Sequence, residues 1–379
     1  MQAPRGRGLP RLWRNVHLWL GAGLFVLIVP IAISGSLLVW RDHLDALINP
    51  ARYAVTAGAS ESLSSFVAAA GAAVGTQYQP FVVRLPEGDG WPVTVSMRES
   101  RSEGGARPRL LTVYLDPPTA RVLEVVEFRS SFIGVLHRFH ENLTIPEYEG
   151  RSIVGWVGVA MLTMALTGIY LWWPRNAPAT RGLRWRRGPG AFSNLHHLVG
   201  FWISIPLAFV SLTGIYLGFP QQGRDLVSTI APMTPQQRGA FAAPLMRQTH
   251  LTIDQALDAA LAATPQAQAT AIFMPMQQAQ AWRVQTRRPE AIDTVTVMVD
   301  DRTGAAAVTA PLAGDRIAQW IRWLHEGSHA GVLWPLVVFL CGLCPPVLGV
   351  TGIVLWLQRR ASRTAIARAQ ELPQLGAAE

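Results

Sequence analysis

The sequence predicts an α-helical membrane protein with four transmembrane helices, arranged as two pseudo-repeats that each carry a small α+β module outside the membrane. Half of the 379 residues are hydrophobic and only 15% are charged, which is too apolar for an ordinary soluble domain of this length. Four stretches reach the roughly 20 apolar residues that a spanning helix needs. None of the four contains Asp, Glu, Lys or Arg: residues 16–40, 153–173, 197–219 and 332–357.

The two halves of the chain repeat one histidine-plus-helix unit. The segment Asn15–Gly21 reappears as Asn194–Gly200, and the apolar stretch that follows each of them ends in Ser-Gly or Thr-Gly. A second histidine in each half precedes the next apolar stretch, which ends in Thr-Gly-Ile. The repeat therefore singles out four histidines at equivalent positions: His17, His196, His140 and His325.

The arginines predict how the helices are oriented. All 33 basic residues are arginines. The N-terminal residues 1–15, the short loop 174–196 and the tail 358–379 each carry four or five of them. The positive-inside rule places these three segments in the cytoplasm, so that segments 41–152 and 220–331 face outward. The net charge of +9 is then a signal of membrane topology and does not indicate nucleic-acid binding.

Each outward segment predicts a helix followed by strands. In the second segment, Thr252–Gln255 has the form of a capping box and apolar residues follow at helical spacing. Its strand-like runs are residues 271–274, 281–286, 294–300 and 305–308. In the first segment, a helix near residues 63–70 precedes strand-like runs at 81–85, 92–97 and 110–116. Asp116 and Asp300 end equivalent strands, where we expect them to form turns rather than to act in catalysis.

Together these features resemble the PepSY-associated transmembrane family over nearly the whole chain. The resemblance depends on the order and duplication of the following motifs: His17…Gly21, His196…Gly200, Leu324-His325-x-Gly327, Val299-Asp300-x-x-Thr303-Gly304 and the Thr-Gly-Ile endings. The first outer module departs from the pattern, because Ala120 stands where Gly304 stands in the second. The family includes bacterial inner-membrane haem proteins that reduce ferric siderophores. The resemblance therefore implies two PepSY-like periplasmic modules, cytoplasmic termini, an inner-membrane location and haem b.

The four equivalent histidines suit two haem sites. If the repeats run in the same direction, one histidine pair falls near the cytoplasmic surface and the other near the outer surface. Haem iron takes two axial ligands, and neutral imidazole is a suitable one. We therefore expect His17 with His196, and His140 with His325, to ligate two haems b. Glycines would let a macrocycle or a neighbouring helix approach closely: Gly21, Gly200, Gly35 and Gly214.

Other ligand assignments stay open. His197 could replace His196, whereas His137 and His329 could replace or assist His140 and His325. The four imidazoles on the outer side could instead bind zinc or non-haem iron.

We expect the protein to be a membrane reductase. The sequence assigns no residue as catalytic. The chain has no nucleotide-binding fingerprint, and the loop 174–196 is too short for a flavin or nicotinamide domain. Electrons would come from a separate cytoplasmic reductase or from quinol, and the resemblance implies a periplasmic ferric siderophore as acceptor, with release of Fe(II). The alternatives are a di-haem relay to another periplasmic acceptor and a non-enzymatic PepSY module that binds peptides or restrains a protease.

Overall fold

The computed structural model describes residues 8–375 except 87, 89, 101–107, 175–179, 181–189, 236–242 and 290. The chain forms two compact units. The helical unit comprises Met1–Trp40, Leu136–Leu226 and Gln319–Glu379, and the sheet unit comprises Arg41–Val135 and Val227–Ala318. The arginines of the loop 174–196, on which the predicted orientation depends, lie outside the described residues.

Long apolar helices dominate the helical unit. Its helices, some of which begin or end in the sheet unit, are α1 (Gly8–Gly23), α2 (Phe25–Val39), α5 (Phe132–Asn142), α6 (Gly150–Trp172), α7 (Ala191–Gly218), α8 (Pro220–Ser228), α10 (Ala313–Glu326) and α11 (Trp334–Leu375). Among the described residues, three helices are long and apolar enough to cross a membrane: α6, α7 and the Trp334–Ile366 part of α11. A fourth candidate is α1 with α2, which pass the same test together but bend by 70°.

The bend in the first apolar stretch differs from the single straight helix expected over residues 16–40. Leu24 separates the two helices with φ −100° and ψ 6°. Gly21 and Gly23, in the last turn of α1, precede the break and lower the helix propensity of the segment. Pro30 removes one donor from the hydrogen-bond ladder of α2. As a result, α1 packs against α6 whereas α2 packs against α11.

Two helices begin earlier than the apolar stretches suggest. The first begins at Gly8 and not at Val16, and the third begins at Ala191 and not at His197. Polar and basic residues can extend a helix beyond the apolar run, so hydropathy alone places the start too late. His196 therefore lies inside α7 rather than ahead of it, and His17 lies in the middle of α1 rather than at the start of a helix.

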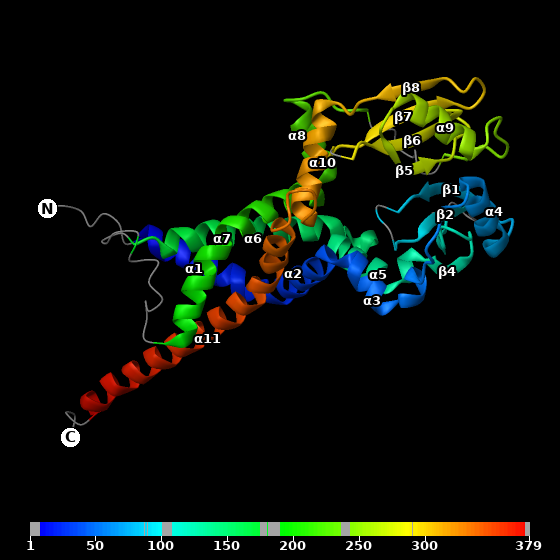
Figure 1. The fold of residues 1–379 in the computed structure, drawn as a ribbon. Helices are drawn as coiled ribbons and strands as arrows, with labels where there is room; N and C mark the ends of the chain where they lie inside the picture. Colours follow the sequence, from blue (N-terminus) through cyan, green and yellow to red (C-terminus); the bar gives the residue numbers. More distant parts are fainter. Residues whose placement is uncertain are drawn as a thin grey trace. The chain divides into compact units, whose positions relative to one another are not determined.

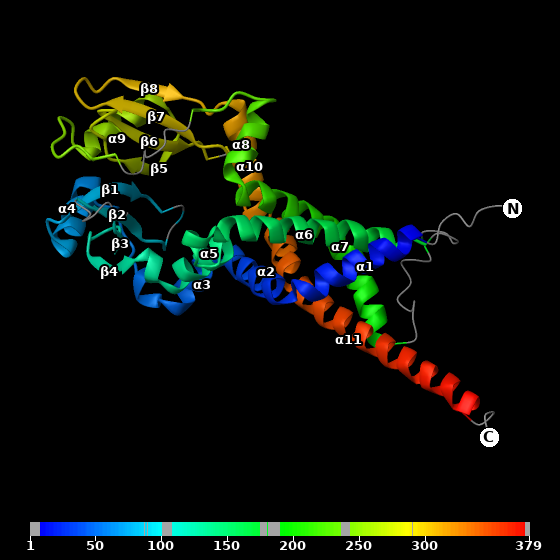
Figure 2. The same cartoon turned by 180° about the vertical axis from the view of Figure 1, so that it is seen from behind.

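Helices α6 and α7 run side by side within the helical unit (Figures 1 and 2). Their backbones meet at Gly155 and Gly218, where a Cβ added to Gly218 would lie 2.7 Å from the Cα of Gly155. Small residues at such contacts let helices approach closely in a membrane, where lipid is as apolar as the helix surface.

The sheet unit is built around one antiparallel sheet of eight strands. Its strands are β1 (Tyr78–Arg84), β2 (Val93–Glu99), β3 (Leu110–Leu115), β4 (Val122–Glu127), β5 (Gln268–Phe273), β6 (Ala281–Arg287), β7 (Val295–Asp300) and β8 (Ala306–Thr309). The strand order is β4-β3-β2-β1-β5-β6-β7-β8. Two four-stranded meanders thus join through β1 and β5, with Val83 opposite Ile272. The predicted separate modules are the two halves of this sheet, and β4 is a strand that the sequence analysis does not predict.

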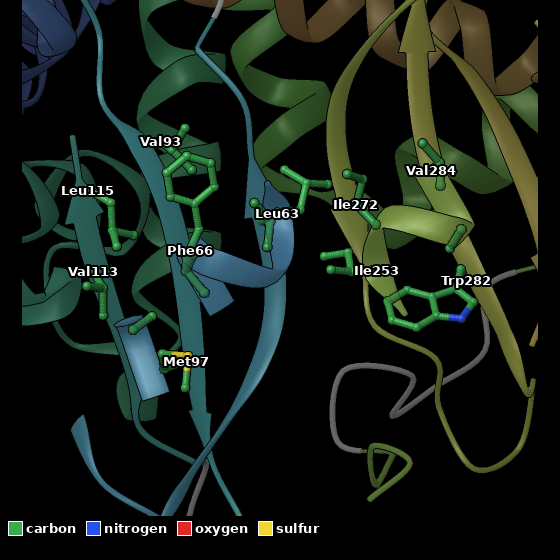
Figure 3. Close-up of a cluster of buried hydrophobic side chains, with 14 of the residues drawn as sticks. Leu63, Phe66, Val93, Met97, Val113, Leu115, Ile253, Ile272, Trp282 and Val284 are labelled. Atoms are coloured by element: carbon green, nitrogen blue, oxygen red, sulfur yellow. The ribbon is translucent and has the colours of Figure 1, made fainter. Parts of the chain in front are cut away.

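One helix from each half supplies the core of the sheet unit. These helices are α4 (Leu63–Val74), capped by Ser62, and α9 (Ile253–Ala263), whose Thr252 and Gln255 form the predicted capping box. Their apolar residues and the inward-facing residues of the strands form one buried cluster. Figure 3 shows Phe66 of α4 beside Val93 and Met97 of β2. The packing confirms the helical and strand periodicities read from the sequence.

The two aspartates at the strand ends form turns, as predicted. Oδ1 of Asp300 accepts hydrogen bonds from the backbone N–H and the hydroxyl of Thr303, both at 2.8 Å. Asp116 is fully buried and accepts a hydrogen bond from the hydroxyl of Thr119 at 2.6 Å. Ala120 follows with φ 51°, close to the 72° of Gly304, so the first turn keeps the same backbone conformation despite its different residue.

Strand β3 offers a matched test of this core. Leu115 is fully buried, whereas Leu110 on the same strand is 39% exposed. We expect Leu115→Ala to lower the free energy of opening the sheet by about 2–5 kcal/mol, because it leaves a cavity. Leu110→Ala should cost less than about 1 kcal/mol. Hydrogen exchange of the strand amides in the full-length protein measures both changes, and equal protection in the two variants would contradict this packing.

Candidate functional site

The helical unit brings the four repeat-equivalent histidines together as two pairs. His17 on α1 and His196 on α7 form the first pair, with ring centroids 6.5 Å apart and ring planes at 84°. His140 on α5 and His325 on α10 form the second pair, with centroids 6.2 Å apart and planes at 37°. Each pair therefore joins a residue to its own counterpart in the other repeat.

Threonine hydroxyls hold the first pair. Nδ1 of His17 lies 2.9 Å from Oγ1 of Thr167 on α6, and Nδ1 of His196 lies 2.9 Å from Oγ1 of Thr351 on α11. Each threonine donates its own proton to a carbonyl four residues earlier in its helix, at 2.7 Å and 2.8 Å. The threonine oxygens therefore accept from the imidazole N–H, which puts the proton on Nδ1 and the lone pair on Nε2.

Backbone carbonyls hold the second pair in the same tautomer. Nδ1 of His140 donates to the carbonyl of Ile31 at 2.9 Å, and Nδ1 of His325 donates to the carbonyl of Val210 at 3.1 Å. A carbonyl can only accept, so both rings carry the proton on Nδ1. Each ring also has a hydroxyl within 3.2 Å of Nδ1, from Ser34 for His140 and from Thr213 for His325.

The second pair is neutral at ordinary pH. Burial, and to a smaller extent the neighbouring His325, lower the pKa of the His140 imidazole to about 4. Burial likewise lowers the pKa of His325. Neutral imidazole with a lone pair on Nε2 is the form that ligates a metal.

A glycine follows each hydroxyl residue and lies against the same imidazole. A Cβ added to Gly35 would lie 2.6 Å from Cε1 of His140, and one added to Gly214 would lie 2.9 Å from Cε1 of His325. For the first pair, the corresponding distances are 3.5 Å from Gly168 to His17 and 3.3 Å from Gly352 to His196. The structure thus gives Gly35 and Gly214 a role that differs from the expected one, since they admit an imidazole ring. The other two glycines admit helix packing, Gly21 against Met164 and Gly200 against Leu348.

The hydroxyl residues are site residues that the sequence analysis misses. The sequence contains the signal, since Ser-Gly or Thr-Gly recurs in each apolar stretch, but the repetition indicates only that the chain is duplicated. The contact of each hydroxyl with an imidazole could not be predicted, because the two groups lie between 106 and 155 residues apart in the chain and meet only when their helices pack together.

Short helices and their ends position the second pair. Glu141, next to His140 on α5, pairs with Arg151 of α6 at 3.1 Å, and Arg151 also donates to the carbonyl of Leu217 on α7. His325 lies near the end of α10, where Gly327 adopts φ 78° and ends the helix. A Cβ on Gly327 would come within 3.4 Å of its neighbours on α2 and α11, so this turn is closely packed.

The three histidines considered as alternative ligands are His137, His197 and His329, and each has a different neighbour. His137 is half exposed and lies 3.9 Å from Glu141 on its own helix. His329 stacks on Trp323 with centroids 4.2 Å apart. His197 lies edge-on to His196 at 6.3 Å. Within the described part of the chain, no three His, Cys, Asp or Glu residues converge as a metal site.

The comparison with known families covers this whole site. The model of the PepSY-associated TM region matches residues 14–359, from ahead of His17 to beyond Thr351. The chain belongs to the PepSY-associated TM family. Membership in this family establishes a membrane protein and agrees with the apolar helices described above. No curated protein matches the chain.

Proposed function

We propose that this PepSY-associated TM protein is an inner-membrane haem b reductase that passes electrons to a periplasmic ferric siderophore and releases Fe(II). The proposal includes four transmembrane helices, with α1 and α2 as one bent span, and PepSY-like modules in the periplasm. It assigns His17 with His196 to one haem b and His140 with His325 to a second.

The spacing of the two histidine pairs carries the proposal. Two imidazoles that bind one metal through Nε2 from opposite sides, at about 2 Å each, have ring centroids roughly 6.3 Å apart. The separations of 6.5 Å and 6.2 Å agree with that value. In all four rings Nδ1 makes the hydrogen bond and Nε2 carries the lone pair, as in ligating histidines whose other nitrogen is held by a neighbouring group.

The chain supplies position and electronics, whereas the haem would supply the one-electron chemistry. Because two histidines would hold each haem, the arrangement favours electron transfer over chemistry that needs an open iron site. Each electron delivered to the acceptor converts one Fe(III) to Fe(II), which hard oxygen ligands hold less tightly. The electrons would come from quinol or from a separate cytoplasmic reductase.

A visible spectrum of the detergent-purified protein tests the proposal directly. We expect a low-spin b-type spectrum on reduction with dithionite and two haems per chain by pyridine haemochrome. Stoichiometric addition of a ferric hydroxamate siderophore to the reduced protein should reoxidise the haem, with Fe(II) captured by ferrozine.

Each other outcome points to a different function. A folded protein without a Soret band would overturn the haem assignment and favour a PepSY binding module. Two haems that ferric siderophores do not reoxidise would favour a relay to another periplasmic acceptor.

A further inference from the structure

Each histidine of the two pairs contacts the same local structure, a hydroxyl residue followed by glycine on a neighbouring helix. These four Ser/Thr-Gly pairs are Ser34-Gly35, Thr167-Gly168, Thr213-Gly214 and Thr351-Gly352. The hydroxyl approaches Nδ1 of the imidazole while the glycine leaves room for Cε1 of the same ring.

The four contacts differ in which acceptor is closer. In the first pair, the threonine hydroxyl lies at 2.9 Å from Nδ1 of both His17 and His196, and the main chain of Met164 and of Leu348 also interacts with these rings. In the second pair, backbone carbonyls lie at 2.9 and 3.1 Å, and the hydroxyl is farther away, at 3.2 Å. A side chain therefore provides the short bond in the first pair, whereas the backbone provides it in the second.

We infer that Thr167 and Thr351 are positioning residues. They orient His17 and His196 toward the iron of the first haem and tune the midpoint potential of that haem. The inference rests on the proposed function, since it concerns ligands of the same haem. In the second pair, Ser34 and Thr213 have a lesser part in orientation, because the carbonyls keep the rings in place without them.

The physical basis is the hydrogen bond donated by Nδ1. It fixes the tautomer and the rotation of the ring, and it makes Nε2 a stronger electron donor to the metal. A stronger donor stabilises the ferric state. Losing the acceptor should therefore weaken haem binding and raise the midpoint potential of that haem alone.

Thr167→Val tests the inference, because valine keeps the shape of threonine and removes the hydroxyl. We expect the first haem to transfer to a haem-binding competitor with an affinity lower by about 10- to 100-fold. Its midpoint potential should rise, and its ferric electron paramagnetic resonance signal should change as the ring turns. Thr167→Ser keeps the hydroxyl and should restore all three properties.

Thr163→Val is the matched control. Thr163 lies one turn earlier on α6 and donates to the carbonyl of Val159 at 2.8 Å, so its replacement should leave both haems unchanged. Ser34→Ala should shift the second haem less than Thr167→Val shifts the first.

The outcomes separate this inference from the proposed function. A wild-type protein without haem overturns both. A wild-type protein with two haems, in which Thr167→Val has the affinity, potential and resonance spectrum of wild type, overturns the positioning role alone. A shift as large in Thr163→Val as in Thr167→Val also overturns it.

Discussion

Under the proposed function, replacing His140 with alanine is expected to reduce the haem content from two per chain to one. The side chain is partly buried, with its Nδ1 donating to the carbonyl of Ile31 and its ring centroid 6.2 Å from that of His325. A haem held by both histidines would keep only His325 in this variant and would bind weakly, so the second haem should be lost on purification. The haem of the first pair, whose ligands lie on α1 and α7, should remain.

The haem that remains shows that the variant is folded, which makes the experiment internally controlled. His137→Ala provides a matched comparison on the same helix, because His137 is half exposed and its nearest charged partner is Glu141. It should retain both haems, as measured by pyridine haemochrome against protein concentration. The ligand assignment is wrong if His137→Ala loses a haem while His140→Ala keeps two.

A single methyl group at Gly35 is expected to have nearly the same effect as removing His140. The added Cβ would lie 2.6 Å from Cε1 of that ring, closer than side chains pack, and 3.2 Å from its Nδ1, which is a tight contact. The ring must turn away, which breaks its hydrogen bond to Ile31 and moves Nε2. We expect Gly35→Ala to lose most of the second haem although alanine favours the helix by about 1 kcal/mol.

Gly168→Ala is the corresponding change at the first pair. There the added Cβ would lie 3.5 Å from Cε1 of His17, an ordinary van der Waals distance, so haem content should stay near that of wild type. Spectra of the two variants, recorded with equal protein and normalised for haem, measure the difference. If both variants bind haem alike, the close contact between Gly35 and His140 does not exist in the protein.

Local patterns in the sequence predict much of this fold. The apolar stretches, the capping box at Thr252 and the alternation of β7 depend on neighbours in the chain, and the structure confirms them. Repeat symmetry also indicates which histidines correspond. These predictions succeed because helical and strand periodicities arise from the backbone itself.

Features that depend on distant contacts are harder to predict. Strand β4 buries only Val126 among its six residues, so its sequence shows little apolar alternation. The joining of β1 to β5 and the contact of Thr167 with His17 both require knowledge of which elements meet.

Equivalent positions of the two repeats meet both where β1 pairs with β5 and in the two histidine pairs. Val83 and Ile272 hold the same place in their meanders, each opposite a buried valine of the next strand, and they pair with one another. His17 meets His196 in the same way, and His140 meets His325. Within each unit, equivalent residues therefore face each other as they do in the isologous interface of a two-fold dimer. The first half of the chain contributes one histidine to each pair and the second half contributes the other, so that neither half contains a complete pair.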